Sequence, residues 1–122
     1  MGSCKGCILC IENQHEICEQ LAPVFNNLGF CVVKASSCYE GLNKSSLVRF
    51  NLYLINSGLP DGSSAELCQQ IRTGDPQTPI IFTSGGNDIK EFSDANEADA
   101  NYILSKPFKL DKLAELVTQL LA

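Results

Sequence analysis

The side chains near the amino terminus that are best able to do chemistry are three cysteines in the stretch CKGCILCIEN. Cys4, Cys7 and Cys10 have the spacing C-x2-C-x2-C, which is typical of loops that hold a metal ion or an iron–sulfur cluster. The same stretch contains a short apolar run that ends at Glu12 and Asn13, which is typical of a buried strand with polar groups at its carboxyl end. A strand would place Cys7 on the opposite face from the other two cysteines, and no fourth ligand lies nearby. The strand is therefore the favoured interpretation.

Other side chains near this strand have types that can bind metals or act in catalysis. His15 follows the polar pair and could join Glu12 and Glu16 in a metal site, but it is the single histidine of the chain. A solvated histidine in the first turn of a helix is the favoured interpretation. Asp61 lies in the stretch LPDG, where a turn residue is favoured over an acidic site residue. Because no nucleophile is paired with a base, the sequence does not predict an enzyme.

The composition limits the class of protein. A chain of 122 residues with 44% hydrophobic and 19% charged residues predicts one globular domain over residues 1–122. The formal net charge of -5 disfavours direct binding of nucleic acid, which requires clustered lysine and arginine. The longest apolar run, Cys7 to Ile11, is too short to cross a membrane, and no signal peptide opens the chain. We therefore expect a cytoplasmic protein without a membrane partner.

The cysteine content predicts the state of the thiols. The chain has seven cysteines, an odd number, and they lie within apolar runs rather than in a loop-rich framework. Reduced thiols that pack as small hydrophobic side chains are therefore expected rather than disulfides. The count itself predicts no redox role.

Short apolar runs alternate with amphipathic stretches along the whole chain. The runs predict strands at residues 7–11, 30–34, 52–55, 80–83 and 102–104. Helices are predicted at residues 14–28, 36–47, 65–72, 88–98 and 110–122. Gly29 ends the first helix, and Pro23 inside it is expected to kink it or to cost a backbone hydrogen bond. The candidate helix caps are Ser36 or Ser37, and Ser63 or Ser64.

Five alternations of strand and helix predict an α/β fold with a doubly wound, five-stranded parallel sheet and helices on both faces. In such a fold a site lies at the carboxyl ends of the strands. The polar residues that the predicted strands bring to this edge are Glu12, Asn13, Asn56, Ser84 and Lys106.

Four pieces of the sequence together resemble the receiver domains of bacterial two-component response regulators. They are ILCI before a polar pair, LPDG after the third strand, the strand TPIIFTS, and SKPF before the last helix. Each piece alone is weak evidence, but together their order and spacing make a specific pattern that extends over essentially the whole chain. The resemblance implies a flavodoxin-like strand order of 2-1-3-4-5. A flavin-binding protein of that order would need a phosphate loop after the first strand, and ENQHE provides none.

The resemblance also implies roles for the residues at the strand ends. In that family two acidic residues after the first strand and an aspartate at the end of the third strand bind Mg2+, and this aspartate accepts a phosphoryl group. The corresponding residues here are Glu12, Asn13 and Asn56. Ser84 and Lys106 match the hydroxyl residue and the lysine that contact the phosphoryl group.

Two further features near the fifth strand belong to the same resemblance. Lys106-Pro107 resembles a cis peptide of the family. The position of the family's aromatic switch residue is occupied by Ile103, with Tyr102 beside it. Because side chains alternate along a strand, Tyr102 is expected to point away from the switch position.

The substitutions predict an altered pocket. The amide of Asn56 cannot form an acyl phosphate as a carboxylate does. One carboxylate remains where the family has three, so we expect the Mg2+ site to be lost or very weak. Lys106 can pair directly with Glu12, which would leave the pocket neutral without a metal.

These expectations lead to a hypothesis and two alternatives. The hypothesis is a degenerate receiver, a pseudo-receiver, that acts without phosphorylation as a protein-interaction or dimerisation module. Its working surface would extend from about Ile89 to Leu121. One alternative is a receiver that switches by an unusual route, at Ser57 or through Glu12. The other is a thiol or metal sensor that uses Cys4, Cys7 and Cys10.

Overall fold

The computed structural model describes residues 4–84, 100–106 and 108–121. Within these ranges the elements in chain order are β1 (Gly6–Ile11), α1 (His15–Asn27), β2 (Phe30–Ala35), α2 (Cys38–Leu47), β3 (Leu52–Asn56), α3 (Ser64–Gly74), β4 (Ile80–Ser84), β5 (Tyr102–Ser105) and α5 (Leu110–Leu121). The strands form one parallel sheet in the order β2-β1-β3-β4-β5, which confirms the predicted fold class and strand order. The helix predicted at residues 88–98 lies outside the described residues.

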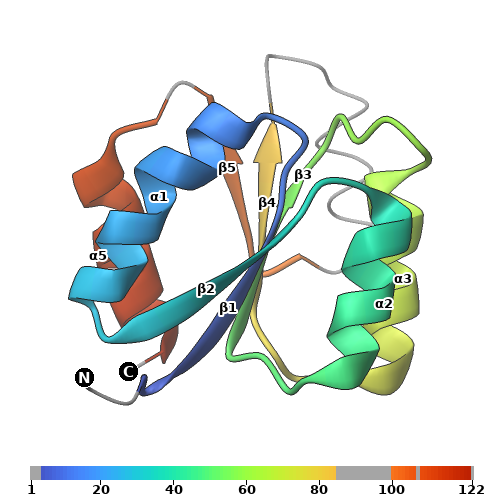
Figure 1. Cartoon of the computed structure of the whole chain (residues 1–122), viewed down its shortest axis with the longest axis horizontal. Helices are drawn as coiled ribbons and strands as arrows, with labels where there is room; N and C mark the ends of the chain where they lie inside the picture. Colours follow the sequence, from blue (N-terminus) through green and yellow to red (C-terminus); the bar gives the residue numbers. More distant parts are fainter. Residues whose placement is uncertain (1–3, 85–99, 107, 122) are drawn as a thin grey trace.

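Two layers of helices cover the sheet. Helices α1 and α5 lie on one face, and α2 and α3 lie on the other (Figure 1). Alternate side chains of each strand enter two hydrophobic cores, which we name after these helices. The α2–α3 core contains Leu9, Ile11, Ala35, Phe50, Tyr53, Ile55, Leu59, Ala65, Leu67, Cys68, Ile71, Ile80 and Phe82. The α1–α5 core contains Ile8, Cys10, Cys18, Leu21, Phe25, Leu52, Leu54, Ile81, Leu113 and Val117.

Local sequence signals explain where the helices begin and end. Ser37 caps α2 by accepting a hydrogen bond from the backbone N–H of Glu40, and Ser63 caps α3 in the same way. Helix α1 continues through Pro23 and ends before Gly29, whose φ of 97° favours glycine. Position 41 on α2 requires a glycine for a steric reason, because a Cβ there would lie 2.6 Å from the side chain of Ile11 on β1.

The structure corrects one expectation about the cysteines. Cys4 and Cys31 form a disulfide, so the prediction that all thiols are reduced is wrong for this pair. The residues just before β1 run beside the start of β2, where the N–H of Lys5 donates to the carbonyl of Gly29 over 2.7 Å. This path brings together two cysteines that are 27 residues apart in the sequence. The free cysteines are Cys7, Cys10, Cys18, Cys38 and Cys68.

The three cysteines of the opening motif do not come together in one place. Cys4 is bonded to Cys31, whereas the buried Cys10 enters the α1–α5 core with its sulfur 3.4 Å from that of Cys18. Cys7 packs against the opposite, α2–α3 core. Strand β1 therefore places Cys7 and Cys10 on opposite faces as its alternation predicts, and the interpretation as a strand is confirmed.

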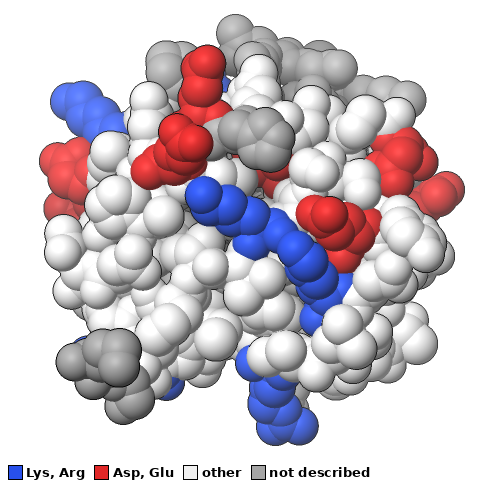
Figure 2. All heavy atoms as spheres, in the orientation of Figure 1, with Lys and Arg blue, Asp and Glu red and all other residues white. Residues whose placement is uncertain are grey.

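The edge strands of the sheet are β2 and β5. Acidic and basic side chains are interspersed on the face that exposes the β2 edge (Figure 2). Lys34 is an exposed residue of β2, and a charged side chain on an edge strand disfavours pairing with another strand. No helix among the described residues is long and apolar enough to cross a membrane.

Candidate functional site

The strand register brings the predicted site residues to one edge of the sheet. Ile11 of β1 pairs with Ile55 of β3, so the next residues, Glu12 and Asn56, lie side by side at the carboxyl ends. Asn56 pairs in turn with Thr83 of β4. Ser84 pairs with Ser105 of β5, and the N–H of Lys106 donates to the carbonyl of Ser84 over 2.7 Å. The parallel register therefore brings together residues that are far apart in the sequence.

Lys106 connects two of these strands through its ammonium group. Its Nζ donates to Oε2 of Glu12 over 2.9 Å and to Oδ1 of Asn56 over 3.0 Å. The Lys106 side chain is 17% exposed and that of Glu12 is 4% exposed, so the ion pair is largely removed from water. The predicted pairing of Lys106 with Glu12 is confirmed.

Both polar atoms of the Asn56 side chain are engaged. Its Nδ2 donates to Oδ1 of Asn13 over 3.0 Å, and its Oδ1 also accepts from the hydroxyl of Thr83 over 3.4 Å. The hydroxyl of Ser64, at the start of α3, donates to the backbone carbonyl of Asn56 over 2.6 Å. Asn56 is thus held by residues of the β1–α1 loop, β4 and α3, and it is buried. An amide suits this position because it both donates and accepts, whereas an ionised carboxylate only accepts.

The remaining predicted residues around the pocket differ in exposure. Ser84 is fully buried, and Ser57 is partly buried, with its N–H donating to the carbonyl of Thr83 over 2.8 Å. Ile103 packs against the α2–α3 core, while Tyr102 is 47% exposed. This arrangement agrees with the predicted alternation of the two side chains on β5. The peptide bond to Pro107 lies outside the described residues.

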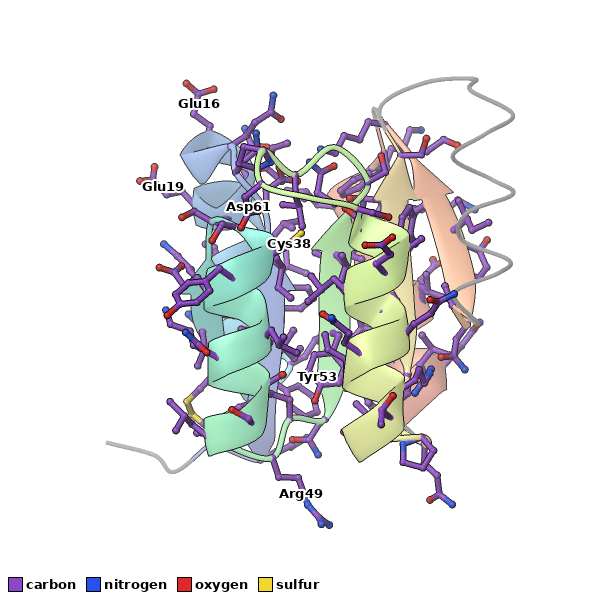
Figure 3. All side chains as sticks on the ribbon, turned by 90° about the vertical axis from the view of Figure 1, so that its right-hand side faces the viewer. Glu16, Glu19, Cys38, Arg49, Tyr53 and Asp61 are labelled. Carbon is purple, nitrogen blue, oxygen red and sulfur yellow. A yellow bond between two sulfur atoms is a disulfide. The ribbon has the colours of Figure 1, made fainter. Side chains whose placement is uncertain are left out.

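Asp61 has a role that the sequence does not show. Its carboxylate accepts hydrogen bonds from the backbone N–H groups of Cys38 and Tyr39, at 2.7 and 3.0 Å, and so caps the start of α2 from a loop 22 or more residues away (Figure 3). The backbone N–H of Tyr39, followed by that of Cys38, holds the pKa of Asp61 below its usual range. Asp61 lies in a loop as predicted, but only the folded chain brings it to the first turn of α2.

A second polar network lies at the opposite, amino-terminal edge of the sheet. The hydroxyl of Tyr53 on β3 donates to Oδ2 of Asp75 over 3.2 Å, and the hydroxyl of Thr78 donates to the same oxygen over 2.6 Å. Tyr53 lies between α2 and α3 (Figure 3). Burial, followed by the neighbouring Asp75 charge, raises the pKa of Tyr53 to about 12. Tyr53 also lines a cavity of about 530 Å³ that is bounded by residues 45–51 and 74–78.

The fold and the strand-end pocket define a class of protein. A five-stranded parallel sheet of order 2-1-3-4-5, with helices on both faces, is a CheY-like flavodoxin fold. The sequence matches the response regulator receiver domain family over residues 8–118. The chain therefore belongs to the response regulator receiver domain family, a signal-transduction module of two-component systems.

Individual relatives and solved structures agree with this assignment. The chain is 31% identical to the transcriptional regulatory protein CrdR of Helicobacter pylori over 107 residues, which cover 87% of the chain and 50% of that protein. It is 28% identical to the uncharacterized transcriptional regulatory protein YkoG of Bacillus subtilis over 109 residues, which cover 89% of the chain and 48% of that protein. The chain thus spans about half the length of these relatives.

Two crystal structures superpose closely on the chain. A receiver domain protein of Methanospirillum hungatei JF-1 has a TM-score of 0.90 at 25% identity and covers 95% of this chain and 93% of its own. A two-component response regulator of Clostridium difficile has a TM-score of 0.90 at 25% identity and covers 96% of each chain.

The residues at the strand ends do not fit the Mg2+ ion that the family implies. Mg2+ binds through carboxylates and water in a near-octahedral arrangement. Of the three positions expected to supply acidic ligands, only Glu12 carries a carboxylate, and Lys106 already contacts it. No group of three histidine, cysteine, aspartate or glutamate side chains that could hold a metal ion occurs among the described residues.

Proposed function

We propose that this receiver domain does not accept a phosphoryl group by the aspartyl route and acts as a protein-interaction or dimerisation module in two-component signalling. The observation that carries the proposal is the set of contacts of Asn56. The residue stands at the carboxyl end of β3, beside Glu12, and its amide binds both Lys106 and Asn13.

The chemistry of the amide supports the first half of the proposal. The nitrogen lone pair of Asn56 is delocalised into the carbonyl, and the carbonyl oxygen carries no full charge. Neither atom can attack phosphorus as an aspartate oxygen does, so covalent catalysis through this residue is lost. The carbonyl oxygen also accepts the hydrogen bond from Lys106, so it is even less available to attack phosphorus.

The electrostatics of the pocket support a single resting state. Lys106 would have to leave Glu12 before it could contact an incoming anion, and Glu12 would then remain buried without its partner. Breaking a largely buried ion pair by removing one partner costs roughly 3–5 kcal/mol. Because Lys106 is already paired with Glu12, it opposes the switching of this domain. The aliphatic Ile103, which stands at the position of the family's aromatic switch residue, also opposes switching.

The alternative routes have less support. Phosphorylation through Glu12 would compete with its ion pair to Lys106. A metal or thiol sensor built from the three cysteines of the opening motif would need them on one side of β1, but Cys7 and Cys10 enter opposite cores. Modification of Ser57 and the cytoplasmic location remain predictions from the sequence.

The surface proposed for the partner is the region from about Ile89 to Leu121, of which β5 and α5 are among the described elements. Two large hydrophobic side chains there contact solvent: Tyr102 is 47% exposed and Leu110 is 39% exposed. Tyrosine is among the residue types enriched at the centres of protein interfaces, and a large exposed side chain such as Leu110 can add apolar area beside it. We propose that they pair with a protein partner, including a second copy of the domain.

Sedimentation velocity over a range of concentrations tests this surface. The parent chain is expected to form dimers, and Leu110→Arg is expected to weaken them at least tenfold because a charge would be buried in the interface. Leu47→Arg is the matched control, since Leu47 is 79% exposed at the end of α2 on the opposite face of the sheet. Dimerisation through this surface is contradicted if the parent stays monomeric or if only Leu47→Arg dissociates it.

A further inference from the structure

Five of the seven cysteines form two separate groups near β1. Cys10 and Cys18 belong to the α1–α5 core, where both are almost completely buried. Cys4, Cys7 and Cys31 lie at the other end of the strand, where β1 and β2 begin. The second group includes the disulfide, and Figure 3 shows this disulfide at the edge of the molecule beside the end of α2.

Cys7 lies directly beside the disulfide. Cys7 of β1 and Cys31 of β2 are register partners in the parallel sheet. Their side chains share a face, because Cys7 packs against the α2–α3 core and Cys31 has the same parity as Val33, which packs there too. Neighbouring strands are about 4.7–4.9 Å apart, which lies within the Cα separations of about 4.4–6.8 Å that disulfides span. Cys31 therefore has two possible partners within reach.

The remaining thiols are less able to attack a disulfide than Cys7 is. Burial is the first cause that raises the pKa of Cys38, to about 11, and that of Cys68, to about 12, so both are protonated and weakly nucleophilic near neutral pH. Cys10 and Cys18 are screened from solvent by the α1–α5 core. By contrast, Cys4 is exposed, and Cys7 and Cys31 are partly exposed.

We propose that Cys4, Cys7 and Cys31 form a thiol–disulfide exchange site in which Cys31 changes its partner from Cys4 to Cys7. The thiolate of Cys7 attacks the sulfur of Cys31, the bond between Cys4 and Cys31 breaks, and Cys4 leaves as a thiolate that takes up the proton given by Cys7. One disulfide is present before and after the step, so no oxidant or reductant is consumed. The product carries a free, exposed thiol on Cys4.

The geometry of the backbone suits this direction of exchange. Cys7 is fixed in β1, where its N–H donates to the Asn51 side chain over 2.9 Å and its carbonyl accepts from the Asn51 N–H over 2.8 Å. Cys4 precedes the strand, so it can leave without breaking the sheet. The exchange releases Cys4 from β2 and exposes a thiol that a low-molecular-weight disulfide can modify.

The test is a map of the disulfides in the full chain after equilibration at mildly alkaline pH. Exchange is quenched with acid, the chain is denatured, and free thiols are alkylated with N-ethylmaleimide before digestion. Lys5 stands between Cys4 and Cys7, so trypsin separates these two cysteines and mass spectrometry reports the alkylated fraction of Cys4. Tandem spectra of the peptide from Gly6 to Lys34 then identify the partner of Cys31.

The parent chain is expected to yield both disulfides, with a measurable alkylated fraction of Cys4. In Cys7→Ser this fraction is expected to disappear, and in Cys38→Ser, a matched loss of a partly buried thiol, it is expected to stay at the parent level. Cys7→Ala repeats the test with an apolar side chain, and circular dichroism confirms that each variant is folded. A parent chain with only the Cys4–Cys31 disulfide, equal Cys4 alkylation in both Cys7 variants, or Cys31 linked mainly to other cysteines would overturn the proposal.

The inference does not rest on the proposed function. The exchange site lies at the amino-terminal edge of the sheet, where β1 and β2 begin, and the Glu12–Lys106 pair lies at the carboxyl edge. The result of the disulfide map therefore does not depend on whether the domain is phosphorylated, and either proposal can fail while the other holds.

Discussion

The two edges of the sheet use buried polar groups in different ways. At the carboxyl edge, Lys106 and Glu12 come from opposite ends of the chain and bond across the sheet. At the amino-terminal edge, Asp75 and Thr78 are three residues apart and bond within one turn, with Tyr53 added from β3. The polar network around Lys106 thus consists of long-range contacts, whereas the network around Asp75 combines a bond within one turn with a long-range bond from Tyr53.

This difference bears on the proposed function. Near the network of Tyr53 and Asp75 the surface has a cavity of about 530 Å³. At the carboxyl edge, Lys106 bonds to both Glu12 and Asn56, the residues that we propose to stand at the family's phosphorylation pocket. At both edges the polar side chains named above bond to one another, as buried polar groups in folded proteins generally do. Only the carboxyl edge does so with the residues on which the family's chemistry depends.

The largest effect is expected when acidic groups are restored at the carboxyl edge, because this removes the contrast between the two edges. Asn13→Asp combined with Asn56→Asp should create a Mg2+ site from three carboxylates, including that of Glu12. Isothermal titration calorimetry should detect binding by this variant and none by the parent. Asn26→Asp with Asn43→Asp adds the same charge at exposed positions on α1 and α2 and serves as the control. If the first variant fails to bind Mg2+, the assignment of the pocket positions is wrong.

The next effect measures how strongly the carboxyl edge is held. Lys106→Ala leaves Glu12 buried and without its cation, so the free energy of unfolding in urea should fall by about 3 kcal/mol. Lys109→Ala, at a nearby exposed lysine, should have little effect. Combining Lys106→Met with Glu12→Gln should recover most of the loss because no buried charge is left alone. An unchanged unfolding midpoint for Lys106→Ala would argue against the ion pair.

A smaller effect is expected at the amino-terminal edge. Tyr53→Phe removes the hydrogen bond to Asp75 and should lower the free energy of unfolding by about 1 kcal/mol at neutral pH. Because the folded chain raises the pKa of Tyr53 to about 12, its contribution is complete below the unfolded pKa of about 10 and is lost as the pH rises between these values.

Urea denaturation at two pH values tests that linkage. The difference in stability between the parent and Tyr53→Phe should narrow between about pH 8 and about pH 11. Tyr39→Phe, at an exposed position on α2, controls for the loss of a hydroxyl group. A difference that stays constant with pH would show that the Tyr53 hydroxyl is not linked to folding.

The smallest effect concerns the exposed cap of α2. Asp61→Ala removes the acceptor for two N–H groups and should lower the melting temperature slightly at neutral pH. Since the pKa of Asp61 is lowered in the fold, this contribution is present above the unfolded pKa of about 3.9 and disappears as the pH falls below it. Thermal melts of both chains should therefore converge in acid, while Glu19→Ala should match the parent throughout.

Sequence patterns predicted the parts of the molecule that depend on periodicity and on strand ends. Apolar runs located the five strands, and the alternation of strand and helix required their carboxyl ends to meet. The pairing of Lys106 with Glu12 followed from the charges left at that edge. Three features did not follow. The Cys4–Cys31 disulfide, the cap that Asp61 provides for α2, and the bond of Tyr53 to Asp75 all join segments that are distant in sequence. Only the path of the folded backbone brings these groups together.

The most direct test of the central claim is the intact mass of the reduced chain after incubation with acetyl phosphate and Mg2+. The contacts of Asn56 with Lys106 and Asn13 predict no added phosphoryl group. The variant that combines Asn13→Asp with Asn56→Asp, treated in parallel, shows whether an aspartate at this position restores the acceptor. A stoichiometric phosphoryl adduct on the parent chain would contradict the account, and peptide mapping would then identify the residue that accepts it.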